Sequence, residues 1–438
     1  MDWDRLFLEA LRSSQADYDD APDWRAALAV CEGLSPDEAA ALDRHIVSMI
    51  HDDYRNPHSS REQLPFDDVM VNLPAGMVPD DLLCIEAAVL VAAERELGEA
   101  LFAFNRLMRS PRWHPLSARL CWLNQEGFAA QRRLMLTEAG RYLGAMLGLA
   151  CGDALGVTLE FMTRSDIRRR FPEGHRDITG GGPFRFAPGE WSDDTAMALA
   201  VADGIIESPE DPVESVGRHF QAWYQSSPPD VGSTCRMALE AHLRTGSWAA
   251  ASEEVALRLG DRAGGNGALM RTLPAALAYR GDAGQAVRIA RMTHPHPESD
   301  AAVAVYQIMV DELLKGRAKG DAFQQAVAAA GGPLTERLAG LPGLAEDRVQ
   351  STGYVADTLE AAIWAFLTTE SLEDCILKAV HLGDDTDTVG AVAGGLAGAW
   401  YGAPGVPRRW SMAIKNRTVL EERAEDLYRL ARTYQQQM

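Results

Sequence analysis

The chain of 438 residues has a mass of 47.7 kDa, and 47% of its residues are hydrophobic and 24% are charged. This is the composition of a globular protein with roughly two to three domains, or with one large domain and an extension. The 63 acidic and 42 basic residues give a net charge of −21. We therefore expect neither a nucleic acid nor an anionic membrane as the main partner, because both bind basic surfaces.

The chain begins with MDWDRLFLEAL, an acidic amphipathic stretch without the basic and then apolar pattern of a signal peptide. The longest apolar stretch, residues 389–404, is too short and too rich in glycine for a membrane span. The cysteines lie far apart with no CxxC pair, which predicts reduced thiols of a cytoplasmic protein and no disulfide or zinc framework. They are Cys31, Cys84, Cys121, Cys151, Cys235 and Cys375.

Residues 1–100 contain 22 acidic and 7 basic residues, a net charge of −15, whereas the remaining 338 residues carry only −6. The segment Ser35-Pro36-Asp37-Glu38 is a capping box that predicts a helix start, and a further helix or helix pair is predicted over residues 80–109. Such a charge asymmetry indicates a separate module or an interaction surface, although an ordinary solvated acidic face explains it equally well.

From Thr137 the chain becomes dense in alanine and glycine, and apolar helical runs alternate with loops rich in glycine and aspartate. We therefore predict an acidic helical N-terminal extension over residues 1–136 and a second domain over residues 137–438. Roughly ten helical segments and few convincing strands predict an all-α fold whose helices are packed through small residues.

Three predicted loops join glycines to acidic groups. The first is residues 152–156, followed by Glu160. The second runs from the glycines at 180–182 to Ser192-Asp193-Asp194, and the third covers residues 381–388. In the second and third loops an apolar helix follows the acids at once, over residues 196–206 and 389–401. Helix capping explains one aspartate in each of these two loops, but not two or three adjacent carboxylates.

Clustered carboxylates repel one another unless a cation lies between them. Carboxylate, hydroxyl and water oxygens are the ligands of hard cations such as Mg²⁺, and the absence of soft ligands disfavours Zn²⁺ or copper. Together the second and third loops supply enough oxygens for two metal ions. The pattern therefore predicts a metal site at Ser192-Asp193-Asp194 and Asp385-x-Asp387-Thr388.

The motifs LACGDALGVTLEF, GGGPF…PGEWSDDTAMAL, GGNGALMR and HLGDDTDTVGAVAGGLAG resemble the ADP-ribosylglycohydrolase family from about Thr137 to the C-terminus. The resemblance implies an all-α fold with a central cleft that holds two Mg²⁺ ions, or sometimes Mn²⁺. The chain departs from the family at Ser192, where threonine is common, and at Asp384, where many members have glycine. The implied metal ligands are Ser192, Asp193, Asp194, Asp385, Asp387 and Thr388, and the implied catalytic candidates are Glu160, Asp193 and Asp194.

The resemblance also implies substrate contacts, which are Gly182, Phe184, Asn266, Gly267, Arg271 and His294. Most of these residues also have a purely structural explanation, because Gly265-Asn266-Gly267 is by itself a turn signal and the glycines at 180–182 give flexibility. Exposed N–H groups at 180–182 could alternatively hold phosphates. We expect neither His294 nor His296 to be a metal ligand, and we expect Asp153 to cap its own turn.

The predicted function is Mg²⁺-dependent removal of ADP-ribose from a modified protein side chain, with ADP-ribosylarginine as the first choice of linkage. The sequence does not assign which acid acts as general acid or base. The alternative is an immunity protein that neutralises an ADP-ribosyltransferase toxin through its N-terminal extension, with or without hydrolysis. An inactive structural relative ranks last, because all six implied metal ligands are present.

Overall fold

The computed structural model describes residues 138–437. The helices predicted near Ser35 and over residues 80–109 lie outside this part of the chain, as do Cys31, Cys84 and Cys121. The boundary between residues 136 and 137 stays a prediction. Of the other cysteines, Cys151, Cys235 and Cys375 are free and buried.

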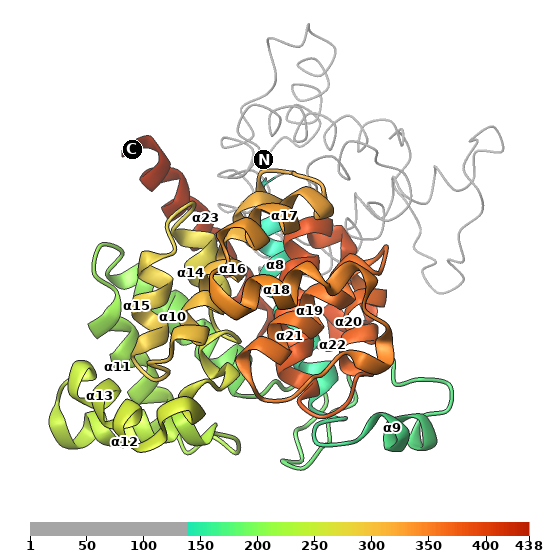
Figure 1. Ribbon diagram of the computed structural model, residues 1–438, viewed down its shortest axis with the longest axis horizontal. Coiled ribbons are helices and arrows are strands. Elements are labelled where there is room, and N and C mark those ends of the chain that lie inside the picture. Colours follow the sequence, from blue (N-terminus) through green and yellow to red (C-terminus); the bar gives the residue numbers. More distant parts are fainter. Residues whose placement is uncertain (1–137, 438) are drawn as a thin grey trace, which may run out of the picture. The chain divides into compact units, whose positions relative to one another are not determined.

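The described part of the chain is built from α-helices and short 3₁₀ turns (Figure 1). Over residues 138–437 there is no β-strand, only two isolated bridges that join Gly181 to Phe186 and Gly265 to Tyr354. The predicted all-α fold is therefore confirmed. The helices are α8 (Glu138–Gly156), α9 (Arg164–Arg170), α10 (Asp193–Glu207), α11 (Val213–Gln225), α12 (Ser233–Thr245), α13 (Trp248–Leu259), α14 (Leu273–Ala278), α15 (Gly284–Arg291), α16 (Pro297–Leu314), α17 (Lys319–Ala329), α18 (Gly332–Ala339), α19 (Val355–Leu367), α20 (Leu372–Val380), α21 (Thr386–Tyr401), α22 (Arg408–Ala413) and α23 (Arg417–Gln437).

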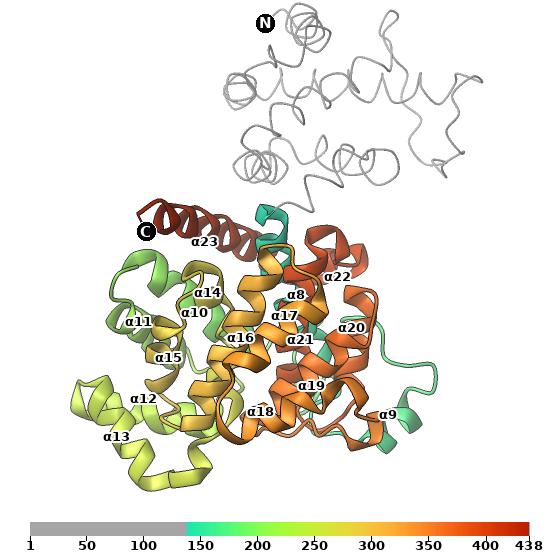
Figure 2. The same cartoon turned by 45° about the horizontal axis from the view of Figure 1, so that its top comes forward.

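Helices α8 and α21 run antiparallel through the interior of this unit and touch along their backbones (Figures 1 and 2). Each helix carries glycines four residues apart, which place one glycine per turn on the shared face. A Cβ atom added to any of them would overlap the backbone of the opposite helix. The facing pairs are Gly144 with Gly398, Gly148 with Gly394, and Gly152 with Gly390.

The prediction of a loop over residues 152–156 is wrong, because these residues form the C-terminal end of α8. Their glycines mark a close approach between helices, not a flexible turn. Gly156 lies against the backbone of Asp387, so the same packing that joins the helices brings the end of α8 to the start of α21.

Several of the remaining helices pack on α21 or on its neighbour α10. Helices α10, α16, α19 and α20 all pack on α21, and α11 and α14 pack on α10. Helix α19 is buried on every side from Val355 to Phe366, which is typical of a central helix in a large core. No helix of residues 138–437 is both long and apolar enough to cross a bilayer. The cytoplasmic location stays a prediction.

The two helices predicted to follow the acidic loops begin three residues earlier than expected. Helix α10 starts at Asp193, with Ser192 as its N-cap, and α21 starts at Thr386, with Asp385 at the cap position. The Ser192 side chain accepts a hydrogen bond from the Asp194 N–H, which is typical of a serine N-cap. The acids therefore stand in first helical turns, where the helix dipole favours negative charge.

Candidate metal centre and active site

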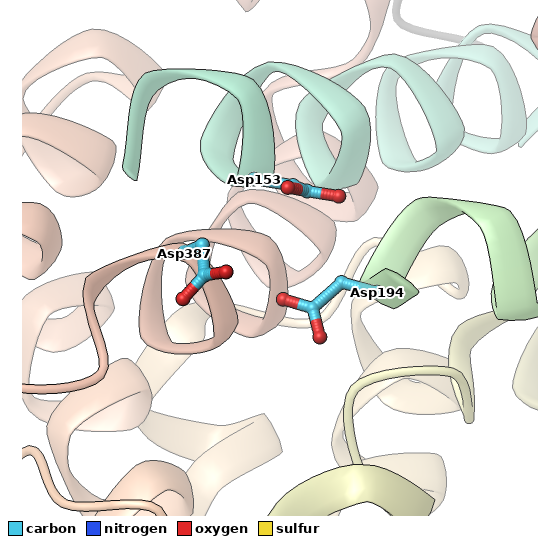
Figure 3. A group of neighbouring side chains, drawn as sticks. All are labelled: Asp153, Asp194 and Asp387. Carbon is cyan, nitrogen blue, oxygen red and sulfur yellow. The ribbon is translucent and has the colours of Figure 1, made fainter. Parts of the chain in front are cut away.

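Three helix ends bring their acidic side chains together. Asp153 comes from the C-terminal part of α8, Asp194 from the first turn of α10, and Asp387 from the first turn of α21 (Figure 3). One carboxylate oxygen of each lies within 4.8 Å of the others, and all three side chains are buried. The three acids come from all three predicted glycine-rich loops, of which the first is in fact the end of α8.

Asp153 holds the start of α10 in place. Its Oδ1 accepts from the Ser192 N–H at 2.9 Å, and its Oδ2 accepts from the Thr195 N–H at 3.0 Å and from the Thr195 hydroxyl at 2.6 Å. The expectation that Asp153 caps its own turn is therefore wrong, because it caps the N-terminus of another helix. The contact fixes the position of Asp194, which lies between the two residues that Asp153 binds.

A second group of carboxylates comprises Glu160, Asp230 and Asp387, again with one oxygen of each within 4.8 Å of the others. Asp230 is half-buried and lies in the loop between α11 and α12, where the Gly232 N–H also donates to Asp193 Oδ2 at 3.2 Å. The sequence interpretation missed Asp230. Its only local signal is a lone acid after Pro228 and Pro229, and nothing in that pattern indicates a distant partner.

The third predicted loop is fixed from two sides. The Asn266 side-chain amide donates to Asp385 Oδ2 and to the Thr358 hydroxyl, both at 2.9 Å. The Thr388 hydroxyl donates to Asp194 Oδ1 at 3.3 Å, which links the starts of α21 and α10. Asn266 therefore orients a candidate metal ligand, and its predicted contact with substrate stays a prediction.

Burial makes this concentration of negative charge costly. Burial, together with the charges of Asp230 and Asp385, raises the pKa of Glu160 to about 9. Burial and neighbouring carboxylates likewise raise the pKa of Asp230 to about 7, and hold the pKa values of Asp194 and Asp387 well above their ordinary range. A bound cation would favour the charged forms and offset this cost.

The unsatisfied oxygens of the centre fit a hard divalent cation. Glu160 Oε2, Asp194 Oδ2 and Asp387 Oδ1 are buried and have no hydrogen-bond partner among the described residues. Buried polar atoms almost always have a hydrogen-bond partner. Three unpartnered oxygens in two carboxylate groups that share Asp387 therefore indicate a position for a ligand. Oxygen donors of this kind suit Mg²⁺ or Mn²⁺.

The structure brings most of the predicted ligands to this centre. Asp194 and Asp387 belong to the carboxylate groups, and the charges of Asp193 and Asp385 act on Glu160. The individual assignments of Ser192, Asp193, Asp194, Asp385, Asp387 and Thr388 as ligands stay predictions. Asp384, whose role the sequence left open, is exposed and belongs to neither carboxylate group.

Two of the predicted substrate contacts brace the turn at Asn266 and Gly267 from the interior. The Arg271 guanidinium is buried and donates to the Gly267 carbonyl and to the Thr293 hydroxyl, both at 2.6 Å. His294 is also buried, and burial lowers its pKa to about 3, so its imidazole is neutral. As placed, both side chains support the turn, and their contact with substrate stays a prediction.

The other two predicted contacts lie in the segment that follows α8. Gly182 has a φ of 68°, and a Cβ there would overlap the Val157 carbonyl oxygen, so close packing alone requires this glycine. The ring of Phe184 lies edge-on to that of Phe161, with centroids 6.4 Å apart. The structure thus places Phe184 beside the residue that follows Glu160, and its contact with substrate stays a prediction.

These features define a class: a helical protein with a buried carboxylate centre that suits divalent cations, assembled from the ends of three helices. The profile of the ADP-ribosylglycohydrolase family matches residues 135–437. The chain therefore belongs to the ADP-ribosylglycohydrolase family, and it is a glycohydrolase. The resemblance seen in the sequence motifs is confirmed.

Several relatives are similar over most of their length. The ADP-ribosyl-[dinitrogen reductase] glycohydrolase of Rhodospirillum rubrum is 38% identical, over 62% of this chain and 88% of that protein. The ADP-ribosylarginine hydrolase Tri1 of Serratia proteamaculans is 35% identical, over 66% of this chain and 79% of that protein. A solved structure described as an ADP-ribosylglycohydrolase-related protein complex is 36% identical, with a TM-score of 0.59, and covers 67% of this chain and 99% of that chain.

Proposed function

We propose that the protein is a Mg²⁺-dependent hydrolase that removes ADP-ribose from modified arginine side chains. The observation that carries the proposal is the buried carboxylate centre, in which three buried oxygens lack hydrogen-bond partners. The arginine linkage is supported by similarity to the ADP-ribosylarginine hydrolases Tri1 of Serratia proteamaculans and Pseudomonas putida, which are 35% and 34% identical to this chain.

The residues that would hold two Mg²⁺ ions, or Mn²⁺ in their place, are Ser192, Asp193, Asp194, Asp385, Asp387 and Thr388. When bound, the ions would orient the ribose hydroxyls and lower the pKa of water. Glu160 and Asp230 lie in one carboxylate group and can divide the proton transfers. The protonated one donates to the leaving guanidine nitrogen, and the ionised one accepts a proton from water. Asp193 and Asp194 remain alternative candidates for these roles.

The direct test is release of ADP-ribose from a protein carrying ADP-ribosylarginine, compared with the same protein carrying ADP-ribosylserine. We expect release from the arginine linkage in Mg²⁺, loss of release in EDTA, and recovery when Mg²⁺ is restored. Hydrolysis of the serine linkage alone would contradict the proposed substrate, and equal rates in EDTA would contradict the metal requirement.

Metal binding should also be visible in stability. A cation that binds only the folded protein stabilises it by RT ln(1 + [L]/Kd), about 2.7 kcal/mol at a concentration of 100 Kd. We therefore expect EDTA to lower the melting temperature and Mg²⁺ or Mn²⁺ to restore it, as measured by scanning fluorimetry. Unchanged melting across saturating Mg²⁺, together with no metal in elemental analysis, would count against the site.

A second candidate function, immunity against an ADP-ribosyltransferase toxin, is favoured by the net charge of −15 over residues 1–100. Such a field would speed association with a basic transferase and would weaken as ionic strength rises. In this proposal the chain protects by two independent routes, hydrolysis of the modification and direct binding of the toxin. Residues 1–136 would supply the binding surface.

The decisive experiment titrates a basic ADP-ribosyltransferase with the double variant Asp194→Ala/Asp387→Ala. The expected result is inhibition at one-to-one stoichiometry without any hydrolysis, and weaker inhibition at high salt. A chain starting near Thr137 should show the reverse pattern, hydrolysis without inhibition. If the double variant fails to inhibit even in excess, residues 1–136 act as scaffold or restrict substrates, and the binding route is refuted.

A further inference from the structure

The residue that follows Glu160 exposes a large aromatic ring. The Phe161 side chain is 68% exposed, although Glu160 itself is buried in the carboxylate centre. Other large apolar side chains of residues 138–437 with comparable exposure are Leu243, Leu257 and Met412, and none of them adjoins a residue of the centre in sequence. An exposed phenylalanine contributes little to folding, because its ring stays in water.

The backbone of Phe161 adopts a conformation that is unfavourable for phenylalanine. Phe161 has a φ of 61°, a region that residues with a Cβ rarely adopt. Its N–H donates to the Asp384 carbonyl at 2.8 Å, and the Asp384 N–H donates back to the Met162 carbonyl at 2.9 Å. Asp384 has a φ of 59° as well. Two strained residues are thus paired directly beside Asp385, and strain of this kind concentrates at functional sites.

Phe184 supports the ring from one side. The two rings meet edge to face at 65°, and Phe184 in turn packs against Phe186 at a centroid distance of 6.2 Å. Phe186 is buried, so the row of three rings is anchored in the core and ends in the exposed ring of Phe161. The arrangement leaves an exposed aromatic ring on the residue that directly follows Glu160 in the chain.

We propose that Phe161 is a specificity residue whose exposed ring receives the acceptor side chain of the substrate, a flat guanidinium cation. The inference rests on the proposed function and adds the subsite for the leaving group. The face of an aromatic ring attracts cations, and guanidinium groups stack on it readily. The neighbouring carboxylates reinforce the preference for a cation. The backbone of Phe161 is hydrogen-bonded to that of Asp384, and its ring packs against Phe184, so the residue is held next to Glu160 and Asp385 before substrate arrives.

The test compares Phe161→Ala and Phe161→Trp with the native protein, using an arginine-ADP-ribosylated peptide as substrate and free ADP-ribose as a second ligand. We expect Phe161→Ala to raise KM for the peptide about tenfold, with kcat changed much less, because binding shared by ground and transition state is lost. Phe161→Trp should retain a low KM. Affinity for free ADP-ribose should be unchanged in both variants, because ADP-ribose lacks the acceptor.

Met412→Ala is the matched control, because Met412 is 68% exposed, lies on α22 and has no role in the centre. An unchanged KM in Phe161→Ala overturns the inference. An equal loss of affinity for free ADP-ribose overturns it too, because the ring would then bind the nucleotide part. Turnover by the native protein separates the proposed function from the proposed subsite. If the native protein hydrolyses the arginine linkage and Phe161→Ala has an unchanged KM, only the subsite is refuted. Absence of that hydrolysis refutes the proposed function and the subsite with it.

Discussion

Replacement of Asp387 by alanine should lower the rate of ADP-ribose release by about a thousandfold. Asp387 is the residue shared by both carboxylate groups, and its Oδ1 is one of the three buried oxygens without a partner. A metal ion contributes several kcal/mol to transition-state stabilisation, and about 4 kcal/mol corresponds to a factor of about a thousand. Asp194→Ala should have a similar effect, since Asp194 supplies another of these oxygens from the opposite helix.

Both variants should remain folded, because removing one acid from a crowded buried cluster also relieves repulsion. The measurement is single-turnover release of ADP-ribose at limiting Mg²⁺, with circular dichroism as a check on folding. Asp384→Asn is the control, because Asp384 is an exposed acid in the same loop and outside both groups. Normal turnover in either alanine variant, or an equal loss in Asp384→Asn, would show that the centre is wrongly assigned.

The replacement Gly152→Ala, which adds a single methyl group, should lower the free energy of unfolding by about 3 kcal/mol, the upper end of the usual cost of overpacking. The new Cβ would overlap the carbonyl oxygen of Gly390, and a Cβ on Gly390 would stand 2.5 Å from the Gly152 carbonyl oxygen. The obstacle on each side is backbone, so no side-chain rotation can make room. Helices α8 and α21 must move apart, which also separates Asp153 from Asp387.

Gly320→Ala serves as the control, because it should leave the free energy of unfolding unchanged or raise it. Gly320 lies in α17 and is exposed, and a Cβ there would meet no atom within 4 Å. Alanine at a free helical position stabilises by up to about 1 kcal/mol relative to glycine. Urea denaturation should therefore show a lower midpoint for Gly152→Ala and an equal or higher one for Gly320→Ala. Equal midpoints for both variants would mean that the two helices are not in backbone contact.

The glycines of α8 show where sequence interpretation reaches its limit. In the sequence alone, glycine beside an acidic residue is typical of a loop, and this pattern predicts a loop over residues 152–156. The same glycines recur every fourth residue, and the structure uses them as the contact face with α21. The two meanings cannot be separated without the partner helix, because a small residue is required only where a second backbone approaches.

The sequence by itself determined the all-α fold, the two acidic clusters that include Ser192 and Asp385 and lie close to helix starts, and the family. These depend on local chemistry, since helical periodicity, capping and clustered acids are all expressed within a few residues. Only the tertiary structure decided which distant residues meet. It placed Asp230 beside Glu160, made Asp153 the anchor of α10, and joined the backbone of Phe161 to that of Asp384. Such contacts join residues 39 to more than 200 positions apart, and packing alone sets those distances.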